Sequence, residues 1–149
     1  MTDLKKRLST IIESPENDTK VKLQKICHLL DQEIPYFNWT GFYFRNGDKE
    51  ELILGPYVGA ETDHTVIPFG KGICGQVAVS NETFVVPDVH EQDNYLSCSI
   101  DTKAEIVVPI IKDGKNIGQI DIDSHHLNPF TEEDRELLEW LCKEIAEIL

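Results

Sequence analysis

The sequence predicts an α+β domain in which N- and C-terminal helices pack on one face of a mainly antiparallel sheet of about six strands. Helical apolar stripes lie before residue 35 and after residue 131. Between them, short strand-like segments are separated by Gly, Pro and Asn-Gly turns, with one short helix among them. This order is typical of α+β domains. With 149 residues and no linker or repeat, a single domain over residues 1–149 is expected.

The first two helices are predicted at residues 3–13, ending before Pro15, and from about Asp18 to Glu33. Pro35 ends the second helix. Its apolar residues recur with the spacing of one helix face: Leu23, Ile26, Cys27 and Leu30. On that stripe, Cys27 is most simply a small buried apolar residue.

Strands are predicted where β-favouring residues run between turn signals. The aromatic segment 38–44 is followed by the turn Asn46–Asp48. The later segments are strands at 51–54, 64–69 and 83–86, with a short helix at about 74–80, strands at 105–111 and 115–123, and a last helix from Thr131. Thr131 with Asp134 resembles a capping box. The last helix carries the stripe Leu137, Leu138, Leu141, Ile145 and Ile148.

The segment 87–103 is long, polar and without periodicity. Structureless segments of this length in a compact domain are usually lids or binding loops. Cys98 lies within it, shortly before a group of carboxylates. A thiol beside acids that cannot all ionise together indicates redox or acyl chemistry on a small polar substrate.

The carboxylates are assigned to one face of the last hairpin by its pattern. A three-residue loop at 112–114, with Gly114 in the left-handed conformation, places Glu105 opposite Asp121 and Ile106 opposite Ile120. Ile106, Ile120 and Ile122 then share one face of the sheet. The opposite face carries Glu105, Gln119, Asp121 and Asp123.

Three carboxylates placed this close repel one another, so at least one should have a raised pKa. A neutral carboxylic acid beside an ionised one is a general-acid arrangement. A solvated polar face and a cation site remain alternatives for the same pattern.

The first strand offers a possible pocket wall. Trp39, Gly41 and Tyr43 lie on one side, opposite Thr40 and Phe42. The rings have polar tips, and Gly41 leaves room between them. Ordinary core aromatics are an equal alternative.

Cys74 is surrounded by Gly70, Gly72 and Gly75 near a predicted helix N-terminus, which would favour its thiolate. A buried structural cysteine is the alternative. Other common catalytic and binding motifs are absent: the sequence has no CxxC pair, no GxSxG motif, no Walker motif, and no His or Cys spacing typical of a metal site. No metal and no cofactor are therefore expected.

The net charge is −13, with 27 acidic residues against 14 lysines and arginines. Nucleic acid and anionic membranes are therefore not expected as partners. No apolar run is long enough to span a bilayer, and the polar first residues do not predict a signal peptide. A cytoplasmic location is expected, in which the four cysteines remain thiols.

Several segments together resemble the free methionine-R-sulfoxide reductases, a GAF-domain family. They lie within residues 36–130 and follow the family order: Asn38–Tyr43 (NWTGFY), Leu54–Tyr57 (LGPY), Ile67–Gly75 (IPFGKGICG), Pro87–His90 (PDVH), Cys98, Glu105–Pro109 (EIVVP) and Ile117–Ser124 (IGQIDIDS). The glycine and strand segments alone indicate only a GAF domain. The combination of Cys98, Glu105, Asp121 and Asp123 is more specific.

The resemblance implies a role for each of these residues. Cys98 would attack the sulfur of free methionine-(R)-sulfoxide and become a sulfenic acid. The carboxylates Glu105, Asp121 and Asp123 would bind the substrate and supply a proton, and Trp39 and Tyr43 would wall the pocket. A second thiol would then form a disulfide with Cys98, which thioredoxin or another thiol would reduce.

The sequence departs from the family pattern at His64, where many members have the resolving cysteine. Cys74 remains as the candidate for that role, and direct reduction of Cys98 by an external thiol is the alternative. The competing interpretation of the whole chain is a non-catalytic GAF sensor. His64 in place of the usual cysteine also fits a third interpretation, a family member that has lost its activity and is kept for binding or oligomerisation. Pairing of two chains as a homodimer is an expectation from GAF domains in general.

Overall fold

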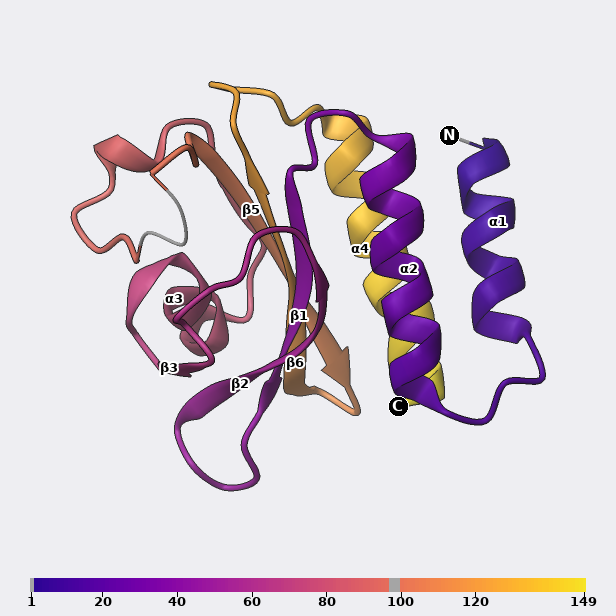
Figure 1. Ribbon diagram of the computed structural model, residues 1–149. Coiled ribbons are helices and arrows are strands. Elements are labelled where there is room, and N and C mark those ends of the chain that lie inside the picture. Colours follow the sequence, from indigo (N-terminus) through magenta and orange to yellow (C-terminus); the bar gives the residue numbers. More distant parts are fainter. Residues whose placement is uncertain (1, 97–99) are drawn as a thin grey trace.

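The computed structural model describes residues 2–96 and 100–149 (Figure 1). Cys98 therefore lies outside the described residues. The elements are α1 (Thr2–Glu13), α2 (Thr19–Glu33), β1 (Trp39–Arg45), β2 (Glu51–Val58), β3 (Val66–Pro68), α3 (Gly72–Ser80), β4 (Phe84–Val86), the 3-10 turn η1 (Val89–Glu91), β5 (Ala104–Lys112), β6 (Lys115–Ser124) and α4 (Glu132–Ile148).

The strands form one antiparallel sheet in the order β3-β2-β1-β6-β5-β4. The predicted α+β class and the strand number are confirmed. The last strand in the chain, β6, lies between β1 and β5 in the middle of the sheet. Its side chains are therefore shielded by neighbours on both sides.

Helices α1, α2 and α4 cover one face of the sheet, as predicted for the terminal helices (Figure 1). α2 and α4 lie against the strands, and α1 packs on the outside of this pair. The apolar stripes interlock with Phe42, Ile106, Ile120 and Ile122 from the sheet. Cys27 is fully buried in this core, as expected for a small apolar side chain.

The opposite face is covered by α3, β3 and the connecting segments (Figure 1). A second apolar cluster there is built from Trp39, Tyr43, Leu52, Ile67, Ile73, Cys74, Val77, Ala78, Val86, Val89 and Val107. The two clusters divide the alternating residues of β1 as predicted, because successive side chains on a strand point to opposite faces.

Local capping explains where two of the helices begin. Asp18 caps α2 by accepting a hydrogen bond from the backbone N–H of Lys20. Thr131 and Asp134 form the predicted capping box at the start of α4. Each cap satisfies backbone donors that the first turn of a helix leaves free.

The predicted hairpin register is wrong by two residues. The loop has two residues, Asp113 and Gly114, both with positive φ (52° and 78°), and a bulge lies between Ile110 and Ile111. Glu105 consequently pairs with Asp123 rather than with Asp121. A shift of two residues keeps every side chain on its predicted face, because the side-chain period of a strand is two.

Smaller differences concern where elements begin and end. β2 continues through Gly55 and Pro56 to Val58, four residues beyond the predicted strand at 51–54. α3 begins at Gly72, two residues earlier than predicted. The long segment after Val86 contains the 3-10 turn η1, capped by the side chain of Asp88.

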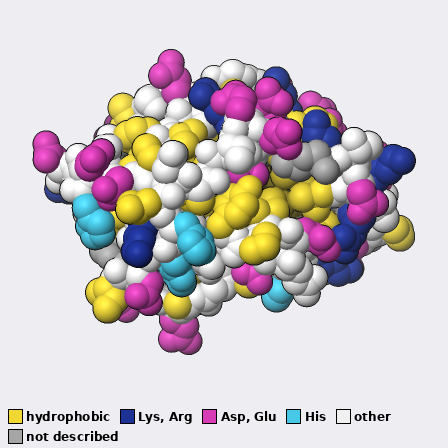
Figure 2. All heavy atoms as spheres, turned by 90° about the horizontal axis from the view of Figure 1, so that it is seen from above, with side chains coloured by type: hydrophobic (Ala, Val, Ile, Leu, Met, Phe, Trp, Pro, Cys, Tyr) yellow, Lys and Arg dark blue, Asp and Glu magenta, His cyan; other side chains and the backbone are white. Residues whose placement is uncertain are grey.

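Acidic side chains are spread over the surface in Figure 2, among fewer lysines and arginines, as the net charge of −13 requires. Among the described residues, none of the helices combines the length and the apolar character needed to cross a membrane.

Candidate active site

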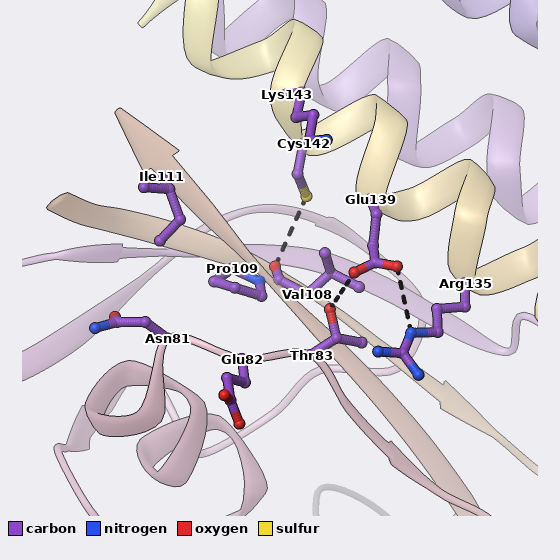
Figure 3. A pocket seen from close by; sticks show the side chains of 10 residues that line it. All are labelled: Asn81, Glu82, Thr83, Val108, Pro109, Ile111, Arg135, Glu139, Cys142 and Lys143. Atoms are coloured by element: carbon purple, nitrogen blue, oxygen red, sulfur yellow. Dashed lines mark hydrogen bonds and ion pairs between the residues drawn. The ribbon is translucent and has the colours of Figure 1, made fainter. Parts of the chain in front are cut away.

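A groove of about 540 Å³ lies between α4 and the β4–β5 edge of the sheet (Figure 3). Several of its polar side chains are held by hydrogen bonds within the groove. Glu139 accepts hydrogen bonds from Thr83 (3.0 Å) and from Arg135 (3.3 Å), and the Cys142 thiol donates to the carbonyl of Val108 at 3.7 Å. These contacts give Glu139, Arg135 and Cys142 structural roles in the groove.

The carboxylates predicted to share a face do so on the side of the sheet covered by α3. Glu105 on β5 pairs with Asp123 on β6. Asp121, two residues before Asp123, points to the same face and pairs with Val107. Glu105, Asp121 and Asp123 are only 4%, 1% and 2% exposed. The alternative of a solvated polar face is therefore wrong.

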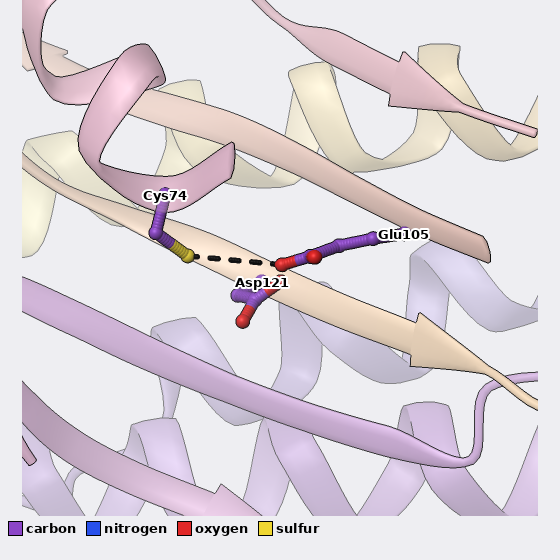
Figure 4. Close-up of side chains that lie close together, drawn as sticks. All are labelled: Cys74, Glu105 and Asp121. Atoms are coloured by element: carbon purple, nitrogen blue, oxygen red, sulfur yellow. Dashed lines mark hydrogen bonds between the residues drawn. The ribbon is translucent and has the colours of Figure 1, made fainter. Parts of the chain in front are cut away.

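Cys74 lies directly over this acid row (Figure 4). Its thiol comes from the first turn of α3 and donates a hydrogen bond to Oε2 of Glu105 at 3.9 Å. Gln119 holds α3 in place, because its Nε2 donates to the backbone carbonyl of Cys74 at 2.9 Å. One helix and two strands thus converge on a single point inside the protein.

The expected thiolate at Cys74 is not supported. Burial raises the pKa of the Cys74 thiol well above 9.0, and the negative charges of Asp121, Glu105 and Asp123 raise it further. The partial positive charge of a helix N-terminus is worth about 1 kcal/mol or less. Desolvation and three acids outweigh it, so Cys74 is a neutral thiol at pH 7.

Asp121 shows the raised carboxyl pKa that crowding of the acids predicts. The largest cause is burial, and hydrogen bonds from Glu105 and Cys74 oppose it. A carboxyl group in this environment keeps its proton to higher pH than a free aspartic acid. The row therefore contains an acid suited to donating a proton.

A small cavity lies where Cys74, Glu105 and Asp121 meet. The free space is about 10 Å³, room for about one water molecule. The other residues that border it are His64, Ile67, Lys71, Gly72, Ile73 and Leu96. A ligand as large as an amino acid enters only if this wall opens.

The segment that leads to Cys98 is attached to α3 beside this cavity. Asn94 accepts a hydrogen bond from the N–H of Gly72 (3.0 Å) and donates one to the carbonyl of Gly70 (2.5 Å). Gln76 donates to the Asn94 carbonyl at 3.2 Å. Leu96 then packs against the backbone of Gly72 and borders the cavity.

The aromatic residues of β1 lie on the acid side, as expected for the possible pocket wall. Trp39 stacks on Tyr57 and on Tyr43, with centroid distances of 5.4 and 6.3 Å. Gly41 makes this stacking possible, because a Cβ atom there would lie 2.5 Å from the Trp39 ring. The space expected at Gly41 is therefore filled by the tryptophan.

Trp39 and Tyr43 are placed differently with respect to open space. Trp39 borders a second cavity of about 120 Å³, together with Asp123, Asp101, Thr102 and His125. Tyr43 is fully buried and borders neither cavity, and its hydroxyl donates to the carbonyl of His64 at 2.9 Å. Tyr43 thus supports the wall that carries His64.

Several residues of the site were not predicted as functional. His64 was noted only as a departure from the family pattern, and Lys71 and Asn94 were not singled out. Each belongs to a loop whose path depends on long-range contacts, and no periodicity marks such positions. The turn-forming glycines at 70 and 72 were the one local signal near them.

The family of the chain follows from comparison with known proteins. The GAF domain profile matches residues 17–149. The free methionine-R-sulfoxide reductase of Saccharomyces cerevisiae is 47% identical over 108 residues, which are 71% of this chain and 59% of the yeast protein. The Escherichia coli enzyme of the same name is 35% identical over 81% of this chain and 72% of its own length.

A solved structure gives the same result. The free methionine-R-sulfoxide reductase of Neisseria meningitidis, in complex with its substrate, superimposes with a TM-score of 0.88 and 36% identity. The match covers 95% of this chain and 84% of that chain. The fold and the profile define this protein as a GAF domain. Within that class, the chain belongs to the free methionine-R-sulfoxide reductase family.

Proposed function

We propose that this chain reduces free methionine-(R)-sulfoxide to methionine. The observation that carries the proposal is the buried convergence of Cys74, Glu105 and Asp121 beside the segment that leads to Cys98. A sensor pocket has no need of a thiol that is hydrogen-bonded to a carboxylate. The relatives named above supply the substrate class.

In the proposed reaction, Cys98 attacks the sulfoxide sulfur and retains the oxygen as a sulfenic acid while methionine leaves. Asp121 is the proton donor for the oxygen, since its raised pKa keeps it protonated more readily than an ordinary aspartic acid. Glu105 and Asp123 offer negative charge to the substrate ammonium. Trp39 provides an apolar surface for the methyl thioether end.

We propose Cys74 as the thiol that resolves the sulfenic acid. Leu96 borders the same cavity as Cys74, and Cys98 follows Leu96 by two residues of chain, which span at most about 7 Å. Because the Cys74 thiol is neutral, its attack requires a base, and Glu105 already accepts its hydrogen bond.

The resolving step balances with these groups. The Cys74 sulfur bonds to the Cys98 sulfur, and its proton passes to Glu105. Glu105 passes this proton on to the hydroxyl of the sulfenic acid, which leaves as water, so that the thiol proton and the hydroxyl account for the water formed. The disulfide is then reduced by an external dithiol of the thioredoxin class.

We place the reaction in the cytoplasm, since Cys27, Cys74 and Cys142 are free thiols. Pairing of two chains as a homodimer stays a prediction.

The test is incubation of the purified chain with racemic free methionine sulfoxide and dithiothreitol, followed by chiral chromatography of the remaining epimers. We expect selective loss of the R epimer. The Cys98→Ser variant should show no loss, and the matched control Cys142→Ser, with its thiol in the helix-covered core, should behave as wild type. If neither epimer is lost, the pocket is a binding site, and the sensor reading replaces the enzyme.

A further inference from the structure

We propose that Cys74, Glu105 and Asp121 form a binding site for one thiophilic divalent cation of the zinc class, and that the bound ion blocks the reaction. The blocking part rests on the proposed function, whereas the binding part does not. The three side chains come from α3, β5 and β6, and each is at most 5% exposed.

The distances between the ligand atoms fit one ion after a small movement. One sulfur and two carboxylate oxygens lie within 4.8 Å of one another, and the sulfur is 3.9 Å from Oε2 of Glu105. Zinc binds sulfur at about 2.3 Å and oxygen at about 2.0–2.2 Å, which places the two about 3.5 Å apart at a tetrahedral angle. The side chains need to move by less than about 1 Å.

A second observation points to a ligand at this place. Asp121 is 1% exposed and borders the cavity, and its Oδ1 has no hydrogen-bond partner within residues 2–96 and 100–149. A buried polar atom of this kind is costly and calls for an explanation. A metal ion in the cavity would bind this oxygen directly.

The donor set and the volume select the class of ion. Magnesium and calcium require six or more oxygen ligands, whereas zinc accepts one thiolate with oxygens in a four-coordinate site. The cavity holds about 10 Å³, which leaves room for one ion without its water shell. His64 and Lys71 border the cavity but lie outside the ligand cluster.

Binding changes the protonation of the site. The Cys74 thiol must lose its proton to bind the ion, and this proton passes to the buffer. The ion also occupies the carboxylates proposed to bind the substrate and removes the thiol proposed to resolve the sulfenic acid. A loaded site therefore excludes the substrate.

The binding test uses Cys98→Ser protein, which keeps the cluster and lacks the proposed nucleophile. Titration with Cd²⁺ should produce the ultraviolet thiolate-to-cadmium absorption band with a stoichiometry of one. The added substitution Cys74→Ser should abolish the band, Asp121→Asn should weaken binding by at least about tenfold, and Cys142→Ser should leave it unchanged. Mg²⁺ should not compete.

A band that persists in the Cys74→Ser protein, or no binding at micromolar Cd²⁺, would overturn the site. Near-ultraviolet circular dichroism of each variant separates loss of binding from loss of the fold. Because this experiment does not involve turnover, its outcome is independent of whether the chain reduces methionine sulfoxide.

The blocking effect is tested in a single turnover. Pre-reduced wild-type protein without added reductant should form about one equivalent of methionine per chain. One equivalent of Zn²⁺ should suppress this burst, and a chelator should restore it. A burst that is unchanged in protein shown to hold zinc would refute the block and leave the binding site standing.

Discussion

The two faces of β6 are equally buried and chemically opposite. Ile120 and Ile122 are fully buried under the helices, and Asp121 and Asp123, the alternating residues, are 1% and 2% exposed on the opposite face. The helix-covered face is apolar and stabilises the fold. The other face holds carboxylates that burial and mutual repulsion make costly. Burial alone thus does not separate a structural face from a reactive one; the chemistry of the alternating residues does.

The largest effect on stability is expected from placing an acid on the helix-covered face. Ile122→Asp should unfold the protein, because an unpaired charge would be buried among the residues of α2 and α4, a cost above about 4 kcal/mol. The control Ile122→Val should cost only about 0.5–1.5 kcal/mol. Chemical denaturation followed by circular dichroism measures both, and a stable Ile122→Asp protein would remove the distinction between the two faces.

A smaller loss is expected from Gly41→Ala on the acid side. The added Cβ would lie 2.5 Å from the Trp39 ring and 2.7 Å from Cβ of Tyr57. Overpacking of this kind costs about 1–3 kcal/mol, and displacement of Trp39 should also lower turnover. The double variant Gly41→Ala/Trp39→Phe should recover part of the stability, since the phenylalanine ring is smaller. Full wild-type stability and activity in the single variant would show that the tryptophan position is not fixed by the glycine.

The sequence predicted which residues share each face, but not how they are paired. Alternation along β5 and β6 placed Glu105, Asp121 and Asp123 on one face although the register was wrong, because an error of two residues preserves the faces. Alternation along β1 left open which of its sides faces the acids, and only the family resemblance put Trp39 there. The bulge at Ile110 and Ile111 has no local sequence signal, so Glu105 was assigned the wrong partner.

The state of the thiol also escaped prediction. The position of Cys74 near a helix N-terminus suggested a thiolate, but its protonation depends on β5 and β6, which bring Glu105 and Asp121 against it. The same is true of His64 and Asn94, whose places are set by contacts between loops. Local sequence patterns therefore predicted the layers of the fold well, and the electrostatics of the site less well.

A gain in stability is expected from Asp121→Asn. The unfolded chain releases the Asp121 proton near 3.8, whereas the folded chain retains it to higher pH. Between these two values the unfolded state binds fewer protons, so the free energy of unfolding falls as pH rises. Asparagine cannot ionise, so the variant should be more stable than the wild type at neutral pH.

Thermal unfolding of both proteins at pH 4 and pH 7 measures this difference. The gain should appear at pH 7 and shrink toward pH 4, while turnover is strongly reduced at both. A variant that is less stable at pH 7 would mean that the Asp121 carboxylate is stabilised by the fold, contrary to the raised pKa. In that case Asp121 would have a structural role in addition to its proposed catalytic role.

The smallest effect on stability is expected from replacing either of two buried cysteines, one on each face of the sheet, by serine. Cys142→Ser and Cys74→Ser each replace a buried thiol that donates a long hydrogen bond, to Val108 and to Glu105 respectively. A hydroxyl can reach the same acceptor after a shift of about 1 Å, and we expect each change to cost about 1 kcal/mol. The two variants should differ in turnover instead. Cys74→Ser should slow the thioredoxin-dependent reaction far more than the reaction with dithiothreitol, whereas Cys142→Ser should change neither. Equal losses with both reductants in Cys74→Ser would contradict a resolving role, and the contrast between the faces would then rest on the carboxylates alone.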